Sequence, residues 1–198
     1  MIAILILAAG RAARMRGGDK LLEEVDGAPC LTLLCNRALA SGAEVFAVIP
    51  DGDHPRATAL PALVHPVPAP DADLGMAHSI RAGIAALPPG TEAAMILPGD
   101  MPEIETADMQ AMIAAFSTTP SQILQAATQD GAPGHPILFA STLFPEFETL
   151  TGDTGARRVI EAHRADWTLF PLPGQRARQD LDTPEDWAAW RASQSREP

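Results

Sequence analysis

The chain opens with a continuous apolar run that predicts a buried strand. Residues 2–7 are all apolar and are followed by Ala-Ala-Gly, a pattern typical of a strand covered on both faces of a parallel sheet. Pro29 begins an apolar-periodic stretch to Ala40 that predicts a helix, closed by Ser41-Gly42. Residues 44–49 predict the next strand, so the chain starts with a β-loop-α-β unit.

The same alternation of strands and helices continues along the chain. We expect one domain over residues 1–192, with 193–198 as a frayed polar tail. Its fold is predicted to be α/β and Rossmann-like, a mostly parallel, twisted sheet with helices on both faces and ligands bound beyond the carboxyl ends of the strands. Further strands are expected at 63–67, 93–97, 122–127 and 167–172, and helices at 75–87, 105–116, 143–150, 156–163 and from Pro184.

Composition excludes several classes of protein. The chain has 198 residues, 46% of them hydrophobic, and a mean hydropathy of +0.04, which is enough for a sizeable core. A net charge of −11 argues against nucleic acid or an anionic membrane as partner, because both need a broad basic face. The apolar run at 2–9 is far shorter than the ~20 residues of a membrane span and follows no basic residue, so we expect a cytoplasmic protein. Cys30 and Cys35 lack zinc-ligand spacing and fit buried thiols of a reducing compartment.

Positive charge is concentrated at the start of this acidic chain. Residues 1–20 hold four cations against one carboxylate, whereas the remainder holds ten cations against 24 carboxylates. Lys20 is also the only lysine, a compact ammonium in a chain that otherwise uses arginine. The distribution indicates an anion-binding loop after the first strand.

That first loop has the composition of a phosphate-binding segment without either common glycine motif. The small residues after Leu7, which are Ala8, Ala9 and Gly10, let backbone N–H groups approach an anion closely. Arg14 and Lys20 can neutralise the charge of a triphosphate. The alternative is a solvated Gly/Arg loop.

Two acidic positions are candidates for binding a cation. Asp100 follows an expected interior strand and lies in a Pro-bounded turn, where its oxygens suit a hard cation such as Mg²⁺, although it could also be a turn or capping residue. Thr183, Pro184 and Asp186 fit the start of a capped helix, which leaves the two acidic residues just before them unexplained. Either Asp180 or Asp182 could supply a second carboxylate, or both could be structural.

The order of short motifs along the chain resembles that of the molybdenum cofactor nucleotidyltransferases, most closely the cytidylyltransferase branch. The resemblance spans nearly the whole chain, and GHP with GD-x-GAR is its most specific part. In that family Gly usually follows the Arg-Met pair and Lys comes five residues after the Arg, whereas here Arg16 follows and Lys20 is six residues after Arg14. The motifs are LAAG-x3-RM…K at 7–20, GM-x2-SI at 75–80, DMP at 100–102, GHP at 134–136, GD-x-GAR at 152–157 and DLDTPED at 180–186.

The resemblance implies transfer of a nucleoside monophosphate, from CTP, to the terminal phosphate of molybdopterin with release of pyrophosphate. It also implies a division of the chain into an N-terminal half that binds the triphosphate and a C-terminal half that binds the acceptor. A molybdoenzyme of the xanthine dehydrogenase type, or its maturation chaperone, is the implied partner. The implied residues are Lys20, Arg14 and Asp100 for catalysis; Leu7, Ala8, Ala9, Gly10, Arg14, Lys20, Gly75 and Ser79 for the nucleotide; Asp100 and Asp182 for Mg²⁺; and His135, Asp153 and Arg157 for the acceptor.

Several of these roles have alternatives. His135 could make a loop hydrogen bond, Asp153 could cap the helix that follows it, and Ser79 could be a helix cap. The guanylyl enzymes of the family typically have Leu-Ala-Gly-Gly, so the methyl group of Ala9 predicts a preference for CTP over GTP. Guanylyl transfer, another phosphorylated acceptor, or a non-catalytic nucleotide-binding or cofactor-binding protein remain the competing hypotheses.

Overall fold

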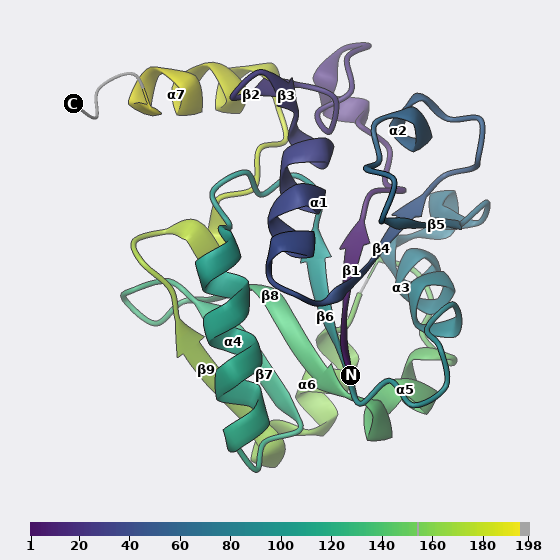
Figure 1. Ribbon diagram of the computed structural model, residues 1–198, viewed down its shortest axis with the longest axis vertical. Helices are drawn as coiled ribbons and strands as arrows, with labels where there is room; N and C mark the ends of the chain where they lie inside the picture. Colours follow the sequence, from purple (N-terminus) through teal and green to yellow (C-terminus); the bar gives the residue numbers. More distant parts are fainter. Residues whose placement is uncertain (154, 195–198) are drawn as a thin grey trace.

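The computed structural model describes residues 1–153 and 155–194, which fold around one twisted sheet of seven strands (Figure 1). The strand order is β5-β4-β1-β6-β8-β7-β9, and a separate hairpin of β2 and β3 follows the first loop. The strands are β1 (Ile2–Leu7), β2 (Glu24–Val25), β3 (Ala28–Pro29), β4 (Glu44–Ile49), β5 (His65–Pro68), β6 (Ala93–Pro98), β7 (Ile123–Ala127), β8 (Pro133–Ala140) and β9 (Trp167–Pro171).

Parallel pairing dominates the sheet, as the alternation of elements predicts. Strands β5, β4, β1 and β6 pair in parallel, and β9 pairs in parallel with β7. Strand β8 runs antiparallel between β6 and β7. The mostly parallel Rossmann-like sheet is therefore confirmed, with one reversed strand in its interior.

Helices cover both faces of the sheet (Figure 1). On one face, α1 and α4 bury Leu34 and Met109 in one core cluster. On the other, α3, α5 and α6 bury Ile80, Phe147 and Val159 in a second cluster, and each large apolar side chain removed from water stabilises the fold by about 1.5–3 kcal/mol. The α-helices are α1 (Cys30–Ala40), α2 (Pro55–Thr58), α3 (Met76–Ala85), α4 (Thr106–Thr118), α5 (Phe144–Phe147), α6 (Arg157–Ala162) and α7 (Pro184–Gln194), and the 3₁₀ turns are η1 (Ala13–Met15), η2 (Ala72–Leu74), η3 (Ser141–Leu143), η4 (Arg164–Asp166) and η5 (Arg176–Arg178).

The last helix packs against the first loop. Trp187 and Trp190 of α7 meet edge to face and form a third apolar cluster with Met15 and Leu181. This cluster fixes the C-terminal segment over the residues that follow β1. Helix α7 continues to Gln194, and the rest of the predicted tail, 195–198, lies outside the described residues.

Strand β8 corrects the sequence-based expectations, which placed no strand between 127 and 143. Pro133 and Pro136 discourage a strand assignment because proline cannot donate to a ladder. The pairs with β6 begin only at Ile137, so both prolines lie beyond that shared ladder. The expected helix at 143–150 is likewise shorter and consists of η3 and the single turn α5.

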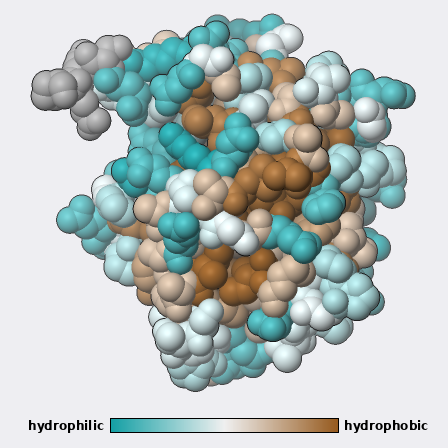
Figure 2. Space-filling model, in the orientation of Figure 1, coloured by the Kyte–Doolittle hydropathy of each residue, from teal (hydrophilic) through white to brown (hydrophobic). Residues whose placement is uncertain are grey.

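The surface and the thiols agree with the composition. Figure 2 shows hydrophobic residues near the middle of the face that carries α1 and α4, within a hydrophilic surround. None of the helices in the described part of the chain has the length and apolar character needed to cross a membrane. Cys30 and Cys35 are buried free thiols, and burial raises the pKa of each to about 12. Neither thiol is therefore ionised at neutral pH.

Candidate nucleotide and metal site

The loop after β1 absorbs the extra residue that separates Lys20 from Arg14. Arg16 takes a left-handed conformation with φ of 51°, and Gly17 follows with φ of 97°, which turns the chain back after η1. Glycine adopts such an angle without steric cost, so the insertion is accommodated in the turn. Lys20 consequently reaches the edge of the sheet where β1 and β6 end.

The Lys20 ammonium lies between the two carboxylates that the sequence nominates for a metal. Its Nζ donates to Asp100 Oδ2 at 2.5 Å and to Asp182 Oδ1 at 2.6 Å. The Lys20 side chain is only 16% exposed, and burial alone would lower its pKa. The carboxylates of Asp100 and Asp182 outweigh that effect and raise the pKa, so the ammonium stays charged.

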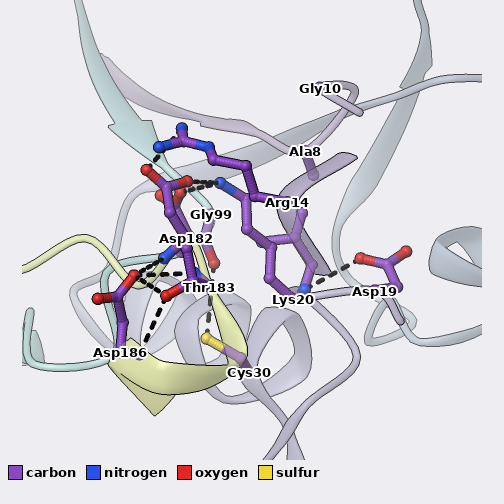
Figure 3. Close-up of polar contacts among 12 residues, drawn as sticks. Ala8, Gly10, Arg14, Asp19, Lys20, Cys30, Gly99, Asp182, Thr183 and Asp186 are labelled. Atoms are coloured by element: carbon purple, nitrogen blue, oxygen red, sulfur yellow. Dashed lines mark hydrogen bonds and ion pairs between the residues drawn. The ribbon is translucent and has the colours of Figure 1, made fainter. Parts of the chain in front are cut away.

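Asp182 is held in place by the cap of α7 (Figure 3). The backbone N–H groups of Asp182 and Thr183 donate to Asp186 Oδ2 at 3.2 and 2.8 Å, and Asp186 N–H donates to Thr183 Oγ1. These bonds are the reciprocal capping box predicted from the sequence. Arg14 Nη2 pairs with Asp182 Oδ2 at 2.7 Å, so the Asp182 carboxylate contacts both Arg14 and Lys20.

Of the two acidic residues beside the cap, Asp182 is the one that contacts Lys20 and Arg14. Asp180 is exposed and makes no ion pair with Lys20 or Arg14. Partial burial raises the pKa of Asp180, and the nearby carboxylates of Asp100 and Asp182 raise it further. Both effects favour the protonated form of the Asp180 carboxyl.

The carboxylates at this site are suited to binding a divalent cation whose remaining coordination positions are filled by a ligand and water. Asp100 Oδ1 is buried and has no hydrogen-bond partner, so one oxygen of this carboxylate is available as a ligand. Within residues 1–153 and 155–194, no three His, Cys, Asp or Glu side chains gather as a complete cation cage. Two carboxylates with the remaining positions filled by phosphate oxygens and water is the coordination that Mg²⁺ commonly takes.

A cavity of about 400 Å³ brings most of the predicted nucleotide residues together. Ser79 is 5% exposed and stands one turn into α3, where its hydroxyl caps nothing and makes no hydrogen bond to the described residues. A separate cavity of about 590 Å³ on the other side of the loop shares Gly10 with the first. The predicted residues that line the first cavity are Leu7, Gly10, Arg14, Lys20, Gly75, Ser79, Asp100 and Asp153.

Two residues of the loop that are predicted to bind the nucleotide have buried side chains. Ala8 is fully buried, and Ala9 is 4% exposed, packed in the core cluster under α3. Neither lines the first cavity, but Ala9 contributes to the wall of the second. Their small side chains let the loop pack directly on the sheet.

Two of the sequence motifs meet where α3 begins. Gly75 has φ of 123°, and a Cβ there would lie 2.5 Å from the backbone of Gly152. Ala77 N–H donates to Gly152 O at 3.1 Å, and Met76 N–H donates to Asp153 Oδ1 at 3.4 Å. Asp153 thus contacts the start of α3, not the helix that follows it in sequence, and lines the first cavity.

The three residues predicted for the acceptor come from different segments of the chain. His135 lies on β8, where burial lowers its pKa and the charge of Asp100 opposes that shift. Arg157 is exposed at the start of α6 and pairs with Glu161. Packing requires a glycine at position 134, beside His135, because a Cβ there would lie 1.9 Å from Ala177 O.

Two further residues contact the loop and were missed by sequence reasoning. Asp73, of η2, pairs with Arg11 across the loop and lines both cavities; its only signal is its position two residues before Gly75. Arg56, of α2, is 2% exposed and bonds the backbone of the loop. No local pattern marks Arg56, because its partners are far away in the sequence.

The sheet, the cation-rich loop after β1 and the paired carboxylates define a nucleotidyltransferase. A family model described as the MobA-like NTP transferase domain matches residues 4–167, and the chain belongs to this family. The family resemblance, the fold and the nucleotidyltransferase class expected from the sequence are thereby confirmed.

Individual relatives cover nearly the whole chain. Purine catabolism protein PucB of Bacillus subtilis (strain 168) is 29% identical over 204 residues, which cover 96% of each protein. The structure of Rv0371c from Mycobacterium tuberculosis H37Rv has a TM-score of 0.83 at 24% identity and covers 96% of each chain; its complex with manganese has a TM-score of 0.77 at 23% identity, covering 95% of this chain and 96% of that one. Molybdopterin-guanine dinucleotide biosynthesis protein A from Archaeoglobus fulgidus has a TM-score of 0.73 at 13% identity, covering 98% of this chain and 100% of that one.

Proposed function

We propose that the chain is a Mg²⁺-dependent CTP:molybdopterin cytidylyltransferase that forms the molybdopterin cytosine dinucleotide and releases pyrophosphate. The observation that carries this proposal is the convergence of Lys20, Arg14, Asp100 and Asp182 at a cavity lined by Gly10 and Ser79. Cations, a free carboxylate oxygen and a small-residue loop are the groups that a triphosphate and its metal require.

The reaction needs charge stabilisation and alignment more than proton transfer. An oxygen of the acceptor's terminal phosphate attacks the α-phosphorus of CTP; a P–O bond forms, and the bond to the β-phosphate oxygen breaks with its electron pair leaving on pyrophosphate. The nucleophile is already an anion, so no general base is required. Lys20 has three N–H donors and uses two on carboxylates, which leaves one for a phosphate oxygen.

Charge balance supports the need for a metal. Lys20 and Arg14 are neutralised by Asp100 and Asp182, so the cluster has no surplus positive charge for a triphosphate. Asp100 and Asp182 would hold Mg²⁺, which would neutralise charge developing on the phosphate oxygens and the leaving group. The manganese complex of Rv0371c supports a divalent cation in this fold.

The choice of CTP rests on Ala9, whose methyl group lies beside Gly10 in the wall of the second cavity and takes up room that a glycine would leave free. A purine needs more room than a pyrimidine, and the steric cost is on the order of 1–3 kcal/mol, as for overpacking in a core. We expect CTP to bind about 10- to 100-fold more tightly than GTP, the ratio that corresponds to such energies. Calorimetric titration of both nucleotides with Mg²⁺ measures this preference. Ala9→Gly should narrow it, and equal affinities in the unaltered protein would contradict the cytidylyl assignment.

The acceptor site and the client complete the proposal. His135, Asp153 and Arg157 are proposed to bind the acceptor, with the triphosphate bound mainly by the N-terminal half. A client of the xanthine dehydrogenase type, or its maturation chaperone, agrees with the name of PucB, a purine catabolism protein. The two free thiols agree with a cytoplasmic location, since that compartment keeps thiols reduced.

Pyrophosphate release tests the proposal. Each of the common nucleoside triphosphates is supplied with Mg²⁺, with and without molybdopterin. We expect release only with both substrates and fastest with CTP. Release that is fastest with GTP would indicate guanylyl transfer, release with another phosphorylated acceptor alone would change the acceptor, and binding without any release would indicate a non-catalytic protein; each result contradicts the proposal.

A further inference from the structure

A buried arginine holds the backbone of the nucleotide loop from the side away from the paired carboxylates. Arg56 Nη1 donates to Ala8 O at 2.5 Å and to Gly10 O at 2.9 Å. Its Nε and Nη2 donate to the two oxygens of Asp19 at 2.7 and 2.9 Å. Four of the five N–H donors of this guanidinium are therefore used on one segment of chain, and the side chain is 3% exposed.

These bonds fix which way the loop presents its amides. In a trans peptide the C=O and the following N–H point in opposite directions. Because Ala8 O and Gly10 O face Arg56, the N–H groups of Ala9 and Arg11 point away from it. Neither N–H donates to a backbone or side-chain acceptor in the described part of the chain. Gly10 and Arg11 line the cavity of Lys20 and Asp100, which Arg56 does not line, and they also line the second cavity together with Ala9 and Arg56.

We infer that Arg56 is a positioning residue for triphosphate binding, an inference that rests on the proposed nucleotidyl transfer. Its guanidinium, itself held by Asp19, fixes the loop carbonyls so that the amides of Ala9 and Arg11 are presented as donors for phosphate oxygens. Asp19 directly precedes Lys20, so the same contact anchors the backbone beside the catalytic ammonium. Arg56 touches no reacting atom and acts through the loop.

A guanidinium is the group that this arrangement requires. Lysine would keep the positive charge beside Asp19, but it has three donors on one nitrogen and cannot span both carbonyls and both carboxylate oxygens. Arg56→Lys therefore keeps the positive charge beside Asp19 and removes the geometry that lets one side chain bond the loop carbonyls and Asp19 together. Arg176→Lys is the matched control, since Arg176 also pairs with a buried carboxylate, that of Asp108, and lies outside the nucleotide cavity.

The experiment measures the affinity for CTP with Mg²⁺ by calorimetry, the kinetics of pyrophosphate release, and thermal unfolding, on the full chain. For Arg56→Lys we expect Kd and KM for CTP to rise at least about tenfold, the scale of one lost charge-assisted contact, with kcat within about threefold. Arg176→Lys should keep both constants near those of the unaltered protein. A folded Arg56→Lys variant with unchanged Kd would overturn the inference.

A double variant distinguishes positioning from the balancing of a buried charge. Arg56→Gln alone leaves Asp19 without its partner, whereas Arg56→Gln with Asp19→Asn leaves neither charge. We expect the unfolding temperature to recover in the double variant while Kd for CTP stays at least about tenfold higher than in the unaltered protein. Recovery of both would show that Arg56 only balances charge. If the unaltered protein binds no triphosphate, the proposed function fails; if it binds and the variants bind equally, only the role of Arg56 fails.

Discussion

Lys20 is the cation that contacts both carboxylates of the candidate site. It contacts both carboxylates and keeps one donor for a phosphate, so its loss removes a cation where the transition state gains negative charge. We expect Lys20→Ala to lower kcat/KM by at least ~100-fold, the scale of one lost transition-state contact. Arg16→Ala is a suitable control, because Arg16 is exposed and, within the part of the chain that the structure describes, its ion pair is with Glu185. Activity of Lys20→Ala within threefold of the unaltered enzyme would contradict the assignment.

Substitutions of the two candidate carboxylates beside α7 are expected to have different effects on turnover. Asp182→Asn removes a charge that contacts both Lys20 and Arg14, whereas Asp180→Asn removes one that contacts neither. We expect Asp100→Asn and Asp182→Asn to abolish metal-dependent turnover, and Asp180→Asn to change it only mildly. Titration of turnover with Mg²⁺ for the three variants measures this. A damaging Asp180→Asn with a silent Asp182→Asn would reverse the assignment.

Residues with distinctive chemistry can be located from the amino-acid sequence, whereas residues that act through the backbone cannot. Lys20, Asp100 and Asp182 are conspicuous by type and by position after expected strands or before a cap, and in the structure Lys20 is hydrogen-bonded to both carboxylates. Arg56 could not be found in this way, because it bonds carbonyl groups, which every residue has. The choice between Asp180 and Asp182 likewise required the cap geometry.

At the scale of elements, the junction of α3 with the loop at Gly152 is tightly constrained. Gly75→Ala would place a Cβ 2.5 Å from backbone atoms and force a side chain into a conformation with φ of 123°. Gly90→Ala tests the backbone angle alone, since Gly90 has φ of 89° and open space around it. We expect Gly75→Ala to lower the free energy of unfolding by clearly more than the ~1 kcal/mol that the angle costs in Gly90→Ala. Chemical denaturation of both variants compares them, and equal losses would contradict the close approach.

Elements with a regular apolar pattern can be predicted from the sequence. Strand β8 is an exception that has a physical cause. The parallel strands read as apolar runs because they are buried on both faces. Strand β8 carries Pro133 and Pro136 in its first half, where it does not pair with β6, and its regular ladder with β6 starts at Ile137. Pairing with β6, which is distant in the chain, and with β7, which directly precedes β8, compensates for a local sequence that disfavours a strand.

For the whole molecule, one sheet carries the two larger core clusters, one on each face, so ligand binding should raise the stability of the chain as a unit. At a concentration of CTP with Mg²⁺ near 100 times Kd, the stabilisation is about 2.7 kcal/mol. For a domain of this size that corresponds to about 5–10 °C in Tm. Scanning calorimetry measures the shift, and Asp100→Asn should lose it. An unaltered protein whose Tm does not move with saturating ligand would contradict binding to the folded state.

The carboxylate pair joins regions that are made at very different times during synthesis. Lys20 and Asp100 lie 80 positions apart, and Lys20 and Asp182 lie 162 positions apart. A nascent chain that has already formed β1 and β6 therefore lacks the second carboxylate until the segment before α7 leaves the ribosome. The proposed site is therefore complete only after that segment has left the ribosome, and proteolytic removal of α7 with the segment before it would take away the second carboxylate.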